Sequence, residues 1–137
     1  MIANIDLLAR LESARAIRAQ KMEDLLSSNS ASEKAEIIVY LRDLHDAYFK
    51  VYSNYDVQLY SYKIILVNFY LEYLESMMSL GRWAADHIKT NGPSLQGIRS
   101  CNNIIQELIT KNVLSDTEKF SWDRVMRKWS HLIGSTD

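Results

Sequence analysis

The sequence predicts an all-α fold in which a long central helix is flanked by shorter antiparallel helices, as in a coiled coil or helical bundle. Residues 31–80 contain neither Gly nor Pro, the two residue types that interrupt helices most strongly. Apolar and aromatic residues recur there every three or four positions, the spacing of one helix face. No stretch alternates apolar and polar residues between turn signals, as a half-buried strand would. A length of 137 residues fits a single helical domain.

The first helix is expected over residues 1–28. Its apolar stripe thins where Arg15 and Arg18 intrude, so we expect it to dock loosely. The stripe consists of Leu7, Leu8, Leu11, Ala14, Met22, Leu25 and Leu26. A polar break follows at residues 27–30. Ser30 and Glu33 have the spacing of a capping box, which predicts the start of the next helix.

The long central helix is expected over residues 31–89. A run of fifty helical residues would be about 75 Å long at about 1.5 Å per residue, which makes the molecule a rod. A break near residues 52–54 would instead allow a globular bundle, and we favour the rod because no helix-breaking residue is present. The helix has a heptad seam with one extra four-residue step between Tyr55 and Leu59. The seam contains Leu41, Leu44, Tyr48, Val51, Tyr55, Leu59, Tyr62, Leu66, Phe69 and Tyr73.

Two flanking helices are expected over residues 93–113 and 115–134. Residues 90–93 form the clearest turn signal, and a proline suits the first position of a helix. Ser115 and Glu118 form a second capping-box pair. The last helix presents a narrow apolar seam at Trp122, Val125, Trp129 and Leu132.

No residue pattern indicates catalysis, a cofactor or a metal. The histidines are far apart in the sequence, and none has a second ligand three or four residues away: His45, His87 and His131. Cys101 is expected to be a small buried hydrophobe. Glu72 and Glu75 resemble half of a carboxylate metal site, but the Glu-x-x-His that such sites use is absent. We therefore expect a non-enzymatic protein with no catalytic, cofactor or metal site.

Composition limits the classes of partner and the export route. A net charge of −1 argues against nucleic-acid binding, which relies on an excess of basic residues. The longest apolar run, residues 64–67, is far shorter than the roughly 20 residues that span a membrane, so no transmembrane segment is expected. The N-terminus lacks a secretory signal pattern, so we expect no export by the general secretory route, whereas specialised routes stay open.

The tyrosines are concentrated in the predicted central helix, between residues 40 and 73. Two explanations stay open: neighbouring helices of the same chain cover this helix on several sides, or the extra tyrosines contact another chain. Tyrosine suits a protein interface because its ring is apolar and its hydroxyl tolerates water. A partner helix or a second copy of the chain is the expected partner. The candidate partner-binding residues are Tyr52, Tyr60, Tyr62, Leu66, Tyr70 and Tyr73.

Several short motifs occur in an order that resembles a known family. The segment Tyr-Phe-Lys-Val-Tyr at residues 48–52 is followed by Tyr60, Tyr62 and Phe69. Leu-Gly-Arg-Trp stands at residues 80–83, before a turn rich in Gly, Asn and Pro, and Lys-Trp-Ser-His-Leu-Ile-Gly stands at residues 128–134. Over about residues 36–136, this order is similar to that of the needle-tip proteins of type III secretion systems.

The resemblance implies a non-enzymatic component of the secretion apparatus, associated with virulence and found at the bacterial surface or secreted, with needle or translocator proteins as partners. The family's long central helix pairs with a long C-terminal helix that follows a mixed α/β region, and this chain ends before both. We therefore expect the chain to correspond to the N-terminal half of a tip protein or to a short relative of one. The alternative is a cytoplasmic helical binding module, such as a small secretion chaperone or regulator.

Overall fold

The chain folds into an all-α helical bundle, as predicted from the sequence. The computed structural model describes residues 4–53, 59–81, 83–84 and 96–133, and within these ranges no strand occurs. Its helices are α1 (Asn4–Ser27), α2 (Ala31–Ser53), α3 (Tyr60–Met78), α5 (Gln96–Thr110) and α6 (Asp116–Ile133).

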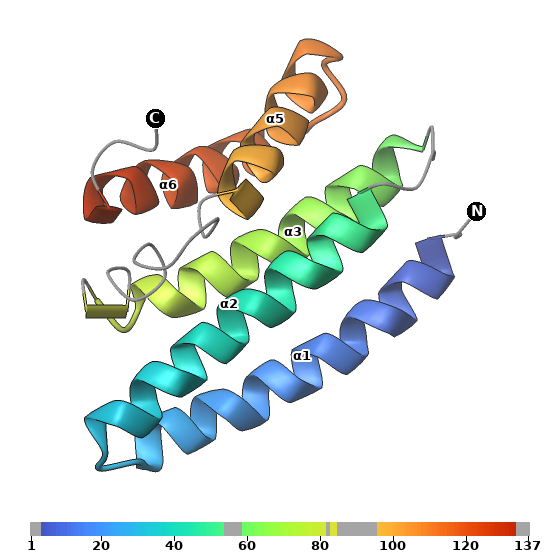
Figure 1. The fold of residues 1–137 in the computed structure, drawn as a ribbon. Helices are drawn as coiled ribbons and strands as arrows, with labels where there is room; N and C mark the ends of the chain where they lie inside the picture. The colour runs from blue at the N-terminus through green and yellow to red at the C-terminus, as the bar shows by residue number, and fades with distance from the viewer. Residues whose placement is uncertain (1–3, 54–58, 82, 85–95, 134–137) are drawn as a thin grey trace.

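The helices are arranged in two layers that share α3 (Figure 1). Helix α2 runs antiparallel to both α1 and α3, and α1 packs against both α2 and α3. On the other side, α5 and α6 pack against α3, and α5 also contacts α2. Helix α3 is therefore covered from both layers, which explains why its apolar residues are not confined to one stripe. Its buried residues are Tyr62, Leu66, Val67, Phe69, Tyr70, Leu71, Tyr73, Leu74 and Met77.

The predicted continuous helix over residues 31–89 is wrong. Helix α2 ends at Ser53, and Leu59 has an extended backbone with φ −77° and ψ 117°. Helix α3 then folds back along α2, so that the Tyr62 hydroxyl donates a 3.2 Å hydrogen bond to the carbonyl of Tyr52. Folding back lets the apolar seams of the two halves bury one another, whereas a rod would leave them in water. The globular alternative is therefore the one that the chain adopts.

Both predicted capping pairs mark helix starts. The hydroxyl of Ser30 accepts a 3.2 Å hydrogen bond from the backbone N–H of Glu33. At α6 the capping box is reciprocal: Glu118 N–H donates to Ser115 Oγ at 3.1 Å, and Ser115 N–H donates to Glu118 Oε1 at 3.0 Å. Helices α5 and α6 fall within the predicted ranges 93–113 and 115–134, while the turn predicted at residues 90–93 lies outside the described residues.

The arginines that thin the apolar stripe of α1 are contacts of its interface with α3. Arg15 donates two hydrogen bonds to Glu72, from Nε to Oε1 at 2.8 Å and from Nη2 to Oε2 at 3.2 Å. Arg18 Nη2 donates to the same Oε1 at 3.0 Å, and the Arg15 guanidinium lies 5.7 Å from the centre of the Phe69 ring. Helix α1 is therefore held by a charged network as well as by its buried leucines and Ala14.

Candidate partner-binding site

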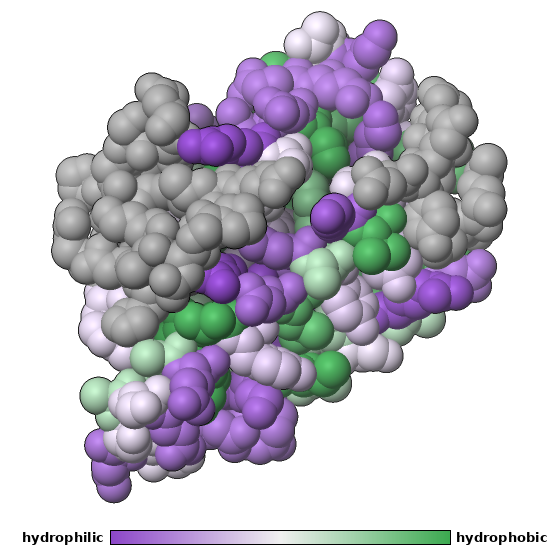
Figure 2. All heavy atoms as spheres, in the orientation of Figure 1, coloured by the Kyte–Doolittle hydropathy of each residue, from purple (hydrophilic) through white to green (hydrophobic). Residues whose placement is uncertain are grey.

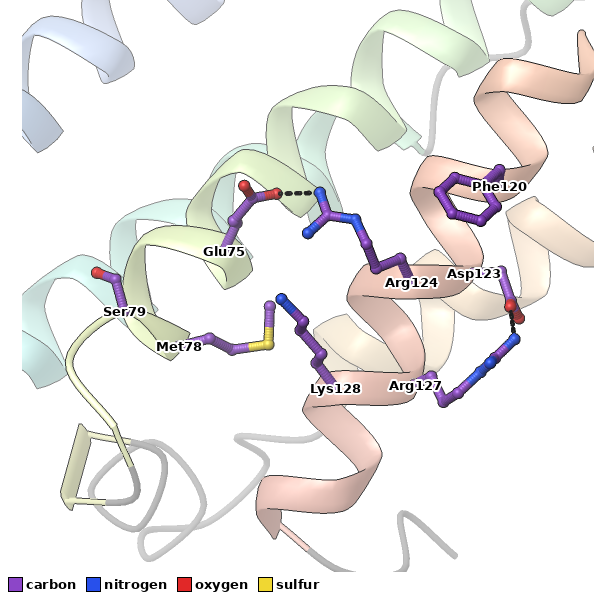
Figure 3. Close-up of a pocket in the computed structure, with 8 residues that line it drawn as sticks. All are labelled: Glu75, Met78, Ser79, Phe120, Asp123, Arg124, Arg127 and Lys128. Carbon is purple, nitrogen blue, oxygen red and sulfur yellow. Dashed lines mark hydrogen bonds and ion pairs between the residues drawn. The ribbon is translucent and has the colours of Figure 1, made fainter.

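A groove with a volume of about 840 Å³ runs between the C-terminal end of α3 and the outer side of α6 (Figure 3). We call it the α3–α6 groove. Helix α3 and the residue that follows it contribute Glu75, Met78 and Ser79. Helix α6 contributes Phe120, Asp123, Arg124, Arg127 and Lys128.

The sequence of α6 explains which side chains reach the groove. Trp122, Val125 and Trp129 form the seam that is buried against the rest of the bundle. Phe120, Arg124 and Lys128 follow one another at intervals of four residues, so they lie in a row along a different face of the helix. The ring of Phe120 is 73% exposed, the second-highest value among the large apolar side chains that the structure exposes. A large aromatic ring is thus presented to solvent at the groove.

An ion pair crosses the groove. Arg124 Nη2 lies 3.7 Å from Glu75 Oε2, and both side chains are partly exposed. Arg127 pairs with Asp123 within α6, so this second ion pair does not cross the groove. The side chain of Lys128 extends toward the Met78 thioether, and no hydrogen bond or ion pair joins Lys128 to another described residue (Figure 3). The groove therefore combines apolar side chains with three cations and two carboxylates.

The coloured surface on one face of the molecule is mainly hydrophilic. On the face shown in Figure 2, hydrophobic side chains show only as patches between hydrophilic ones. Apolar surface that is open to solvent is therefore local on this face.

Most of the predicted partner-binding residues lie in the core of the chain. Tyr62, Leu66, Tyr70 and Tyr73 are at most 1% exposed, and Tyr52 is 9% exposed. Only Tyr60, at 38%, presents its ring to solvent. The predicted partner contact is therefore wrong for Tyr52, Tyr62, Leu66, Tyr70 and Tyr73, because other parts of the same chain bury them. The reason is the reversal between α2 and α3, which places α2 and α5 against the faces of α3 that a rod would have exposed.

The α3–α6 groove was missed in the sequence, although one signal for it was present. Phe120 lies outside the Trp122, Val125 and Trp129 seam, and basic residues stand four and eight positions after it. An exposed aromatic residue beside cations on the outer face of an amphipathic helix is typical of a contact surface.

A cluster of buried polar groups lies deeper in the bundle. The ring of His45 stacks on Tyr73 and Phe69, with ring centres 4.3 Å and 5.1 Å apart. Its Nδ1 donates a 2.7 Å hydrogen bond to the carbonyl of Leu41, and Arg18 Nη1 lies 3.5 Å from Nε2. Burial lowers the pKa of His45 to about 4, so the ring is neutral near pH 7.

The remaining candidate residues are Cys101 and the side chains able to ligate a metal. Cys101 is fully buried, as predicted, and burial raises the pKa of its thiol far above the ordinary value, so it is held as the thiol. Among residues 4–53, 59–81, 83–84 and 96–133, no three His, Cys, Asp or Glu side chains are grouped so that they could hold a metal ion. His87 lies outside the described residues.

Within the described residues, no helix is both long enough and apolar enough to cross a lipid bilayer. In comparisons with known proteins, no family model, no curated protein and no solved structure matches the chain.

Proposed function

We propose that the chain is a non-enzymatic protein-binding domain and that its α3–α6 groove receives a helix of a partner protein. The observation that carries this proposal is the ring of Phe120, which is 73% exposed at a groove of about 840 Å³. Aromatic side chains are enriched in protein interfaces and often supply much of the binding energy. Met78 on the opposite side adds a flexible apolar side chain that can adapt to an incoming surface.

The proposed setting is a type III secretion system, with the chain acting as a component of the needle-tip kind and needle or translocator proteins as partners. The support is the order of motifs between residues 48 and 134. The long uninterrupted helix that the resemblance implies is replaced by the α2–α3 reversal, so this setting rests on the sequence alone.

A second candidate is a cytoplasmic helical module that holds an amphipathic helix, as a small secretion chaperone or regulator does. The folded-back bundle with an open groove favours this candidate, because helix-in-groove binding needs a concave apolar surface on a folded domain.

Site-specific photocrosslinking tests the proposed function. A photoreactive amino acid replaces Phe120 in the chain, expressed in a bacterium with a type III secretion system, and Lys50 on the exposed side of α2 is the matched control position. We expect one protein adduct from position 120 and none from position 50. The same adducts from both positions, or none from either, would contradict the proposal.

Fractionation of the same cells separates the two settings. A tip-like component should appear in the culture supernatant only when the secretion system is active. A chaperone or regulator should stay in the cytosol and form its adduct there, whether or not the system exports protein.

A further inference from the structure

We infer that the partner of the α3–α6 groove is an amphipathic helix that carries two carboxylates one turn apart, and that Arg124 and Lys128 bind this pair. The inference rests on the proposed function, because it names the chemistry of the partner that the groove would receive.

The spacing of the two cations defines the partner's charge pattern. Arg124 and Lys128 are four residues apart on α6 and both line the groove, so their charged groups lie about one helical turn apart. Two acidic residues at positions i and i+4 of a partner helix have the same spacing. An antiparallel or parallel helix in the groove can therefore place one carboxylate beside each cation.

Both cations are available to a partner. The separation of 3.7 Å between Arg124 and Glu75 exceeds normal hydrogen-bond length, so a partner carboxylate can replace this weak contact. Lys128 has no hydrogen bond or ion pair to another residue that the structure describes, and Arg127 is engaged by Asp123. Because the whole chain carries a net charge of −1, the attraction is a local property of this groove.

The apolar side chains set the rest of the partner's pattern. Phe120 precedes Arg124 by one turn, and Met78 faces Lys128 from α3 (Figure 3). A matching helix would present leucine-like residues to Phe120 and Met78 and its carboxylates beside them. A nucleic acid is disfavoured, because Arg127 is paired with Asp123 and the two remaining cations of the groove are too few for a continuous row of phosphates.

Designed peptides test the inference. Three labelled 18-residue helices share one leucine face and differ only in a flanking i, i+4 pair, which is Glu–Glu, Gln–Gln or Lys–Lys. Fluorescence anisotropy with the full chain at low salt should show the Glu peptide binding about tenfold more tightly than the Lys peptide, since about 1.4 kcal/mol corresponds to tenfold. The ratio should shrink at high salt, where exposed charges are screened.

Charge reversal makes the test specific for the two cations. The double variant Arg124→Glu with Lys128→Glu should invert the preference, so that the Lys peptide binds more tightly than the Glu peptide. The control Lys50→Glu with Lys111→Glu makes the same change in net charge at two exposed positions and should keep the original preference. If the reversed variant does not fold, as judged by circular dichroism, Arg124→Gln with Lys128→Gln replaces it and should abolish the preference.

The possible failures are distinguishable. Equal binding of the three peptides, or tighter binding of a single-stranded oligonucleotide, would overturn the inference. Binding of no peptide would overturn it as well. The crosslink from position 120 decides separately whether the groove binds a protein of any charge pattern.

Discussion

The hydroxyl of Tyr70 on α3 donates a 2.7 Å hydrogen bond to the Asp46 carboxylate on α2, beneath the start of α5. Burial of this carboxylate raises its pKa from 3.8 to about 6, and the hydrogen bond from Tyr70 only partly opposes the rise. The charges near Asp46 are Arg42, which lowers its pKa, and Asp43, which raises it. A titrating group thus lies where three helices meet.

Asp46→Asn should stabilise the protein at pH 7.5. Because the folded-state pKa is raised, the contribution of Asp46 to the free energy of unfolding is complete below pH 3.8 and is lost as the pH rises through about 6. The neutral amide keeps an acceptor for Tyr70 and removes the buried charge, a gain of at most about 3 kcal/mol at about 1.4 kcal/mol per pKa unit. Urea unfolding of the wild type and of Asp46→Asn at pH 7.5 and pH 4 measures this gain in the free energy of unfolding. A gain of equal size at both pH values, or an equal gain from the exposed control Glu36→Gln, would contradict this account.

His45→Phe should make the protein less sensitive to acid. The pKa of His45 is lowered from 6.5 to about 4. Its contribution to the free energy of unfolding is therefore complete above pH 6.5 and is lost as the pH falls toward 4. Phenylalanine keeps a ring between Phe69 and Tyr73 and cannot titrate. Between pH 6.5 and 4, the wild type should lose up to about 3 kcal/mol relative to the variant. Arg18 and Glu72 carry the charges near the ring. Parallel stability curves for the two proteins would disprove the assignment.

Gly97→Ala should loosen α5. A Cβ atom at Gly97 would come within 2.5 Å of the Tyr70 hydroxyl and closer still to Asp46 Oδ1. Alanine is the better helix former by about 1 kcal/mol, but the clash forces α5 to shift or breaks the hydrogen bond. We expect a net loss of about 1–3 kcal/mol in the free energy of unfolding, typical of overpacking, measured by urea unfolding. Asn103→Ala, at an exposed position of α5, should cost little. A stabilised Gly97→Ala protein would show that the contact is not tight.

Phe69→Ala should destabilise the chain by about 3–5 kcal/mol, because the ring is fully buried and its removal leaves a cavity. Tyr70→Ala should be comparably severe, since the ring is buried and Asp46 loses its hydrogen bond. Tyr60→Ala should change stability by less than about 1 kcal/mol because its ring is 38% exposed. Thermal melting curves compare the stabilities of the three variants. Unchanged melting of Phe69→Ala, or collapse of Tyr60→Ala, would reverse the assignment of core and surface.

Local signals predicted the helices, and distant contacts decided their arrangement. The capping pairs at Ser30 and Ser115 act within one turn, so the sequence alone located both helix starts. No Gly or Pro marks the break before Tyr60 in the sequence. The break forms when burying the apolar seam of α3 against α2 lowers the free energy more than continuing the helix would. The free energy of that burial comes from contacts between residues far apart in the chain.

The candidate site shows the same division. Periodicity identifies residues that share a helix face, but it does not say whether the same chain or a partner covers that face. The sequence therefore predicts a partner contact for Tyr70 and Tyr73, whereas the chain itself buries both. The α3–α6 groove forms where α3 packs against α6 and brings together residues such as Glu75 and Arg124, which are 49 positions apart in the sequence, and no short-range pattern encodes that packing. Only Phe120 could have been noticed as an aromatic residue outside the α6 seam.

The position of α3 between two layers has a consequence during synthesis. The chain leaves the ribosome N-terminus first, so α1 and α2 can pair before α3 is complete. The side of α3 that receives α5 and α6 stays open until residues 96–133 have been made. A nascent chain stalled between α3 and α5 would expose this side of α3, and should be the species that general chaperones bind and that aggregates first.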